Sequence, residues 1–206
     1  AAFAEAGHAL DRDDYLRAAE RNAAFLLQEL RADDGHLFHT WRDGQAKVRG
    51  YLDDYANLVD GLLALHQATF DTRWLRAGID LTERMLDHFR APQGGFFDTS
   101  DAHEKLVARP RSLQDNAVPS GNAMATFNLL RLSQLAVEPK YEKVGRHSLR
   151  QVQEMMGRIP LGFGQWLTAL EYALAETREI AIIGEKGSPA VNALLAVAGD
   201  GFQPHR

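Results

Sequence analysis

Three carboxylates near the starts of two expected helices are the residues of this sequence best suited to chemistry. Asp53 and Asp54 lie in "GYLDDYA" (50–56), and Asp115 opens "DNAVPSGNA" (115–123). Two facing carboxylates can hydrolyse a glycosidic bond, because one protonates the leaving oxygen while the other activates water or attacks the sugar. We therefore expect Asp53 or Asp54, together with Asp115, to act as catalytic residues.

Aromatic and small polar side chains accompany these carboxylates. A sugar site needs a flat apolar surface for the C–H face of the ring and polar groups for its hydroxyls. A guanidinium can in addition clamp a carboxylate or phosphate, although a solvated basic loop has the same composition. We expect a sugar or sugar-phosphate ligand to be bound by the following residues: Trp41, Tyr51, Tyr55, Arg109, Ser120, Gly121 and Asn122.

The same segments also have a purely structural explanation. Acidic residues favour the positive end of a helix dipole, and Ser120, after Pro119, is a good N-cap. Capping accounts for Ser120 and for one of the paired aspartates. It accounts less well for Asp115 and Asn122, because these polar side chains are clustered where one cap would suffice. Both explanations stay open from the sequence.

Other kinds of site have less support. No two histidines are four residues apart with a carboxylate as a third ligand, so we expect no metal and no cofactor. The chain has no cysteine, which excludes disulfides and thiolate chemistry within it. The net charge of -5 gives no reason to expect nucleic acid. No apolar run approaches the roughly 20 residues that span a bilayer, so we expect no membrane insertion.

The segments are embedded in a repeated pattern. "YLRAAERNAAFLLQELRADDGHLFHT" (15–40) matches "WLRAGIDLTERMLDHFRAPQGGFFDT" (74–99) at corresponding positions, and a fainter third copy starts at Tyr141. The repeat of about 60 residues is longer than the roughly 33 to 47 of common helix-pair solenoids. It suits a helical hairpin with an elaborated connection between its two helices.

Apolar spacing predicts six main helices in three antiparallel pairs. Outer helices with one wet side are expected over 13–31, 72–90 and 139–157, and more apolar inner helices over 51–70, 120–136 and 163–176. Short strand hairpins are expected in 35–50 and 94–110, with a strand near 180–183 and a helix from Ser188-Pro189. The predicted fold is mainly α, an open double-layered α/α ring over 1–178 followed by a strand-helix tail over 179–206.

Three blocks of the sequence carry a family resemblance. "GYLDDYANLVDGLLALHQATFDTRWL" (50–75), "GGFFDTSDAHEKLVARP" (94–110) and "DNAVPSGNA" (115–123) resemble the C-terminal half of a family that includes the spermatogenesis-associated thioredoxin-domain proteins. The resemblance covers 1–186. It implies a partial (α/α)6 toroid, related to six-hairpin glycosidases and N-acylglucosamine 2-epimerases and joined to an upstream thioredoxin-like domain. The matching site positions are Asp54, Tyr55, Asp115, Ser120, Gly121 and Asn122.

Two functional classes remain open. One is a carbohydrate-active enzyme, either a glycosidase-like hydrolase or a sugar epimerase. Epimerases of the related fold use a pair of histidines, and the sequence shows no such pair at the starts of the inner helices. The other is a non-catalytic toroid, a sugar-binding or protein-docking module partnered with the thioredoxin-like domain. We expect the chain to be part of a longer cytoplasmic protein, to contact the N-terminal part of that parent, and to self-associate as an isolated fragment.

Overall fold

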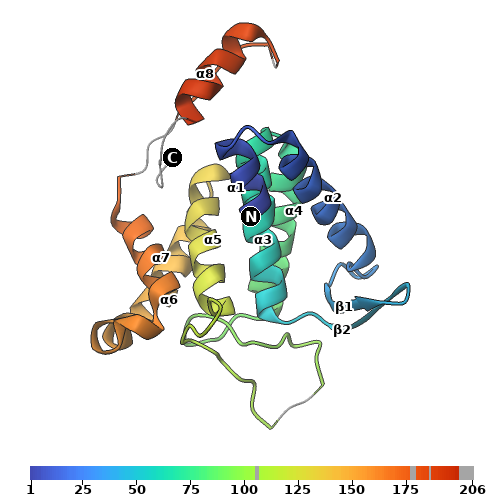
Figure 1. Ribbon diagram of the computed structural model, residues 1–206. Coiled ribbons are helices and arrows are strands. Elements are labelled where there is room, and N and C mark those ends of the chain that lie inside the picture. Colours follow the sequence, from blue (N-terminus) through green and yellow to red (C-terminus); the bar gives the residue numbers. More distant parts are fainter. Residues whose placement is uncertain (105–106, 177–179, 186, 200–206) are drawn as a thin grey trace.

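A computed structural model of the chain describes residues 1–104, 107–176, 180–185 and 187–199. The fold is mainly helical and contains one antiparallel sheet of two strands (Figure 1). The elements are α1 (Ala2–Ala9), α2 (Asp13–Glu29), β1 (Phe38–Arg42), β2 (Gln45–Arg49), α3 (Leu52–Thr69), α4 (Thr72–His88), α5 (Gly121–Leu135), α6 (Pro139–Arg158), the short 3-10 helix η1 (Pro160–Gly162), α7 (Gly164–Leu174) and α8 (Pro189–Gly199). Among the described residues no helix has the length and hydropathy required to cross a bilayer.

The six main helices confirm the prediction from apolar spacing, and each end lies within two residues of its expected position. Local capping sets several of these ends. The Asp71 side chain accepts from Arg73 N–H at the start of α4, and the Ser120 side chain accepts from Ala123 N–H at the start of α5. The start of α6 combines Glu138 as a cap with a proline in the first turn.

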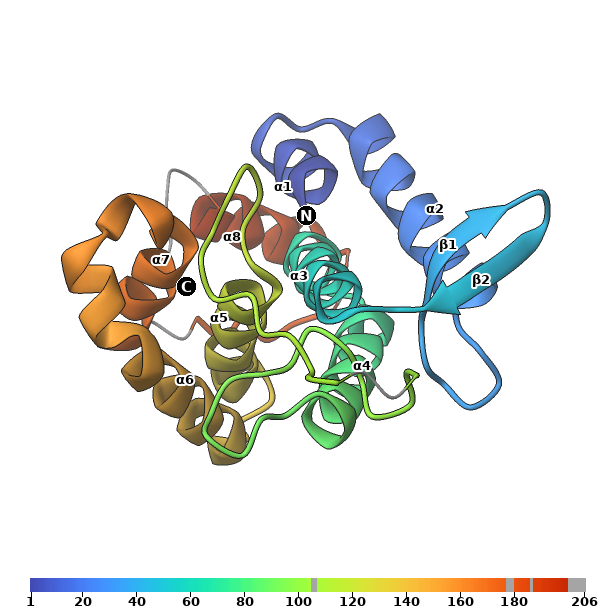
Figure 2. The same cartoon turned by 90° about the horizontal axis from the view of Figure 1, so that it is seen from below.

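The helices form an inner and an outer layer (Figure 2). The inner helices α1, α3, α5 and α7 lie side by side, and α2, α4 and α6 pack outside them. The inner helices α3 and α5 run in the same direction, because Gly121 at the start of α5 packs on Asp53 at the start of α3. Further along both helices, Asn128 donates a hydrogen bond of 2.7 Å to the carbonyl of Ala56. The N-terminal ends of both inner helices therefore lie at the same end of the molecule.

The closely packed pairs differ from the hairpins that the repeat suggested. The pairs α3–α4 and α5–α6 are joined by the short links 70–71 and 136–138, and each pair packs along its length. The elaborated connections instead lead from an outer helix to the next inner helix, and α2 contacts α3 less extensively than α4 does. The reason is chain length, since a link of two or three residues forces its helices to be antiparallel neighbours.

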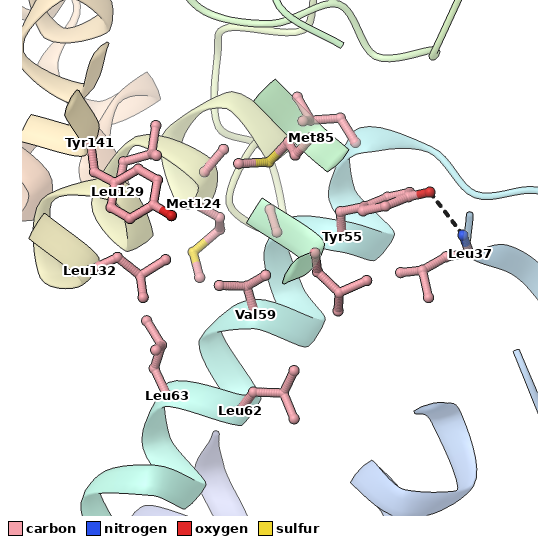
Figure 3. Close-up of a cluster of buried hydrophobic side chains, with 14 of the residues drawn as sticks. Leu37, Tyr55, Val59, Leu62, Leu63, Met85, Met124, Leu129, Leu132 and Tyr141 are labelled. Atoms are coloured by element: carbon pink, nitrogen blue, oxygen red, sulfur yellow. Dashed lines mark hydrogen bonds between the residues drawn. The ribbon is translucent and has the colours of Figure 1, made fainter. Parts of the chain in front are cut away.

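The main core lies between α3, α4 and α5 (Figure 3). Side chains from these helices that are 0% exposed include Val59, Leu62, Leu63, Met85 and Leu129. Burying each such side chain contributes roughly 1.5–3 kcal/mol. A second cluster joins α5, α6 and α7 around Trp166. This packing holds the N-terminal ends of the inner helices in fixed positions, and the long connections cross over these ends.

The strand predictions are partly wrong. The hairpin in 35–50 is confirmed, with a turn at Asp43 and Gly44, which both have positive φ as a two-residue hairpin turn requires. The described part of 94–110 has no strand pair, only an isolated bridge between Arg90 and Phe96, because side chains rather than a ladder satisfy its backbone. Residues 180–183 are not a strand, and 179 lies outside the described residues. The helix that follows begins at Pro189, as expected.

Candidate functional site

The expected site residues gather at one end of the helical layers, where α3 and α5 begin and the long connections cross (Figure 1). They form two groups there. The first lies between the β1–β2 hairpin and the start of α3, and comprises Trp41, Tyr51, Asp53 and Asp54. The second lies at the starts of α5 and α7, and comprises Asp115, Ser120, Gly121 and Asn122. The groups meet where Gly121 packs on Asp53, since a Cβ on the glycine would lie 3.0 Å from Asp53 N.

The carboxylate of Asp54 is the centre of the first group. It accepts a hydrogen bond of 2.8 Å from the backbone N–H of Tyr51, which closes the start of α3. The same carboxylate lies 2.8 Å from Nδ1 of His39 on β1. Burial raises the pKa of Asp54, and the hydrogen bonds from His39 and Tyr51 oppose that rise. Because an ionised carboxylate only accepts, Nδ1 of His39 carries a hydrogen, and in the neutral imidazole Nε2 is left to accept one.

Aromatic rings hold the imidazole of His39 in place. The ring of Tyr51 meets it edge to face, with centroids 5.1 Å apart, and His103 lies against Tyr51 with centroids 5.2 Å apart. His103 is itself fixed, because Nδ1 contacts the Ser100 hydroxyl at 2.8 Å and Nε2 contacts the carbonyl of Arg49 at 3.2 Å. The expectation that no pair of histidines lies at the start of an inner helix is therefore corrected. His39 and His103 both lie against Tyr51 there.

A cavity of about 710 Å³ between α1, α2 and α3 reaches His39 and Asp54. Its polar end is formed by His39, Asp53, Asp54 and Asn57, and the side chain of His39 is 42% exposed. Most of the remaining wall is apolar, with side chains that include Ala19, Ala23, Leu26, Leu58 and Leu65. A ligand at the polar end can reach an imidazole, two carboxylates and an amide without displacing a core side chain.

Asp115 has a different environment from Asp54. One carboxylate oxygen accepts from Ser120 N–H at 2.8 Å, and the other accepts from Gln165 N–H at 2.9 Å. The carboxylate therefore closes the starts of α5 and α7 together, where unpaired backbone donors and the helix dipoles favour an anion. Capping thus explains Asp115, although one cap serves two helices rather than one. Ser120 is the N-cap of α5, as the structural explanation proposed.

Two expected ligand-contacting residues are fully buried. Tyr55 is 0% exposed, and its hydroxyl accepts from Leu37 N–H at 2.8 Å. Asn122 is also 0% exposed, and its amide pairs with the N–H of Phe96 at 2.8 Å and the carbonyl of Phe96 at 3.1 Å. Neither side chain has surface left for a ligand, which corrects both expectations. Both residues instead attach connections to the inner helices.

Trp41 and Arg109 lie apart from each other. Trp41, on β1, is 41% exposed, and its ring meets Phe25 of α2 edge to face at 5.3 Å between centroids. Arg109 donates to the carbonyls of Thr99 and His88 and covers the ring of Phe97 at 4.2 Å. Arg109 therefore stabilises the connection 89–120, whereas Trp41 keeps an accessible aromatic surface beside His39.

The sequence reasoning missed His39, His103 and Asn57. His39 reaches Asp54 only when the β1–β2 hairpin folds back onto α3, because 15 residues separate the two in the chain. One signal was present: His39 and Trp41 alternate in a strand pattern, which places both on one face. No group of three or more metal-binding side chains was found among the described residues.

Comparisons with known proteins find similar chains but no activity. No protein-family model matches the chain. It is 27% identical to spermatogenesis-associated protein 20 of Homo sapiens and of Mus musculus, over 99% of this chain and 27% of each relative. It is 24% identical to an uncharacterised protein of Caenorhabditis elegans, over 89% of this chain and 26% of that protein. The chain thus spans about a quarter of the length of these relatives, and the similarity supports the resemblance to the family that includes the spermatogenesis-associated proteins.

Proposed function

We propose that the hairpin end of this chain binds a carbohydrate and that His39 exchanges a proton with it. The observation that carries the proposal is the contact of 2.8 Å between His39 and Asp54 at the polar end of the cavity. An imidazole whose Nδ1–H is held by a carboxylate has a fixed tautomer, and its Nε2 can act as a general base.

The neighbouring residues suit a polyhydroxylated ligand. Asp53 and Asn57 lie in the wall next to His39 and supply hydrogen-bond acceptors and a donor for hydroxyl groups. Trp41 lies two residues after His39 on β1, so it shares the same face roughly 6.7 Å along the strand. Its exposed ring offers the apolar surface on which the C–H face of a sugar can rest.

The geometry favours proton transfer over hydrolysis by two carboxylates. Hydrolysis requires a second free carboxylate opposite Asp54, and the two oxygens of Asp115 already accept from backbone N–H groups. A carboxylate-held imidazole instead suits abstraction or return of a proton, as in a sugar epimerisation. Glycoside hydrolysis through Asp53 or Asp54 remains the alternative within the same substrate class.

A binding measurement with matched variants tests this proposal. Monosaccharides and sugar phosphates would be titrated into the chain and followed by ligand-observed NMR. His39→Gln and Asp54→Asn should each weaken binding by tenfold or more, about 1.4 kcal/mol. The free energy of unfolding of each variant should stay within roughly 0.5–1 kcal/mol of the parent's value. His147→Gln, on α6, is the control and should bind like the parent. Equal binding by His39→Gln and the parent, or no binding of any sugar at millimolar concentration, would refute the site.

A second candidate function is protein docking, and α8 favours it. This helix has no charged residue and none of its residues is buried, with Leu194 55% and Val197 74% exposed. Such an apolar surface is typical of an interaction site. The docking partner would be the remainder of a longer parent, including the thioredoxin-like domain that the resemblance implies. Sugar binding that survives deletion of α8 would separate the two functions.

A further inference from the structure

Two imidazoles outside the proposed sugar site meet at the base of the hairpin. His36, in the connection before β1, is 7% exposed, and His88 ends α4. Their ring centroids are 4.5 Å apart at an angle of 54°. Nδ1 of His36 lies 3.2 Å from the hydroxyl of Tyr55 on α3. These three residues, His36, His88 and Tyr55, form what we call the histidine clasp.

The hydrogen bonds of the clasp are complete when His36 is neutral. The Tyr55 hydroxyl accepts from Leu37 N–H at 2.8 Å, and its own hydrogen then has Nδ1 of His36, 3.2 Å away, as its acceptor. Nδ1 can accept only when the hydrogen of the neutral imidazole is on Nε2. A second hydrogen on the ring would leave the phenol hydrogen without this acceptor. Because Tyr55 is 0% exposed, water cannot replace the lost bond without opening the structure.

The surrounding charges also disfavour a protonated His36. Burial is the main cause that lowers the pKa of His36, followed by the nearby His88. Arg49 of β2 and Arg84 of α4 lower it further, and only the carboxylate of Asp34 acts in the opposite direction. Asp34 is already engaged, since Arg49 donates to both of its oxygens at 3.1 and 2.7 Å. Nδ1 of His88 lies 2.9 Å from a carboxylate oxygen of Asp101.

The clasp holds the base of the element that carries His39 and Trp41. Leu37 binds Tyr55 through its N–H and accepts from Gly50 N–H at 2.7 Å through its carbonyl, so both ends of the hairpin depend on it. We propose that protonation of His36 opens the clasp and detaches the β1–β2 hairpin from α3 and α4. The hairpin is thus an acid-sensitive element, attached at neutral pH and released in mild acid. This inference goes beyond the proposed function, since it holds with or without a sugar ligand.

The size of the effect follows from the difference in proton binding between the two states. A histidine in the open state has an ordinary pKa of about 6.5, while in the closed state burial lowers the pKa of His36. The clasp is therefore fully stable above about pH 6.5 and weakens as pH falls below it. Opening should be up to about tenfold more favourable at about pH 5.5 than at about pH 7.5.

Hydrogen exchange of the ligand-free chain measures this opening directly. Amides of 30–50, corrected for intrinsic exchange, should exchange up to about tenfold faster at the lower pH, whereas those of the α5 core should not. His36→Gln retains an acceptor for Tyr55 but cannot be protonated, so its exchange in 30–50 should be independent of pH. His66→Gln, at the far end of α3, is the control and should keep the parent's pH dependence.

A second variant keeps the test decisive if His36→Gln does not fold. Tyr55→Phe retains the buried ring and removes only the hydroxyl, so it should speed exchange of 30–50 at neutral pH and reduce the acid effect. An acid-induced increase in His36→Gln or Tyr55→Phe equal to that of the parent overturns the proposal. An increase spread over all helices overturns it as well, because that would be global unfolding. Neither result depends on sugar binding, which the separate ligand titration decides.

Discussion

Replacing Asp115 with alanine should destabilise the fold, because this carboxylate closes two inner helices at once. Its hydrogen bonds to Ser120 N–H and Gln165 N–H measure 2.8 and 2.9 Å. An N-cap acceptor is worth about 0.5–2 kcal/mol, and a hydrogen bond to a charged group about 1.5–3 kcal/mol. Asp115 is partly exposed, so water replaces some of the lost interaction. We therefore expect a loss of roughly 2–3 kcal/mol in the free energy of unfolding.

Urea unfolding followed by far-UV circular dichroism measures this loss. For a domain of this size each kcal/mol corresponds to about 2–4 °C, so the melting temperature should fall by roughly 4–12 °C. Asp115→Asn keeps one acceptor oxygen, so its free energy of unfolding should fall by about half as much. Asp53→Ala removes an exposed carboxylate at the start of α3 and is the control, with an expected loss below about 1 kcal/mol.

The opposite result would refute the capping argument. If Asp115→Ala has the same urea midpoint and slope as the parent but no longer binds sugar, the carboxylate serves a ligand. The two N–H groups would then have found water or another acceptor at no cost. Loss of both stability and sugar binding would leave capping as the explanation, since an unclosed inner-helix end displaces the neighbouring residues.

Three further predictions follow from the described contacts. Gly121→Ala should lower the free energy of unfolding by about 1–3 kcal/mol, because its Cβ would lie 3.0 Å from the backbone of Asp53. Gly157→Ala, whose Cβ would have nothing within 4 Å, should be neutral or slightly stabilising. The side-chain hydrogen bond from Arg49 lowers the pKa of Asp34 to about 2, so their pairing is present above about pH 3.8 and lost as pH falls toward 2. An NMR titration of the Asp34 carboxyl should show this midpoint, and Arg49→Gln should return it toward the ordinary value. The exposed apolar surface of α8 should make the chain self-associate in light scattering across a concentration series, and deletion of α8 should abolish that dependence.

The helices could be predicted because their signals are local. Apolar residues at helical spacing and caps such as Asp71 and Ser120 act within one turn, so the six main helices need no knowledge of their neighbours. The hairpin of 35–50 is equally local, since Asp43 and Gly44 form its turn. The prediction of a hairpin in 94–110 was wrong because the interactions of that segment are not local. Asp98, Arg109 and Asn122 satisfy that connection through contacts with residues distant in the chain.

The position of the candidate residues in the fold was predictable, but their contacts were not. The sequence correctly indicated that polar residues collect where inner helices begin, because helix starts carry unpaired N–H groups. It did not indicate which polar group each would meet. Asp54 and Asp115 look alike in the sequence, yet one holds an imidazole and the other holds two helix starts. Tyr55 lies one residue after Asp54 and points into the core instead.

The sequence by itself therefore determined the helices, their wet and buried faces, and the end of the layers at which polar residues gather. Only the tertiary structure decided that His39 reaches Asp54, that Asp115 is shared by α5 and α7, and that His36 is enclosed beside His88. The physical reason is the range of the interactions. Helix formation depends on residues three and four apart. The protonation state of a side chain and its remaining hydrogen-bond donors and acceptors depend instead on the distant groups that packing of the layers brings within about 3 Å of it.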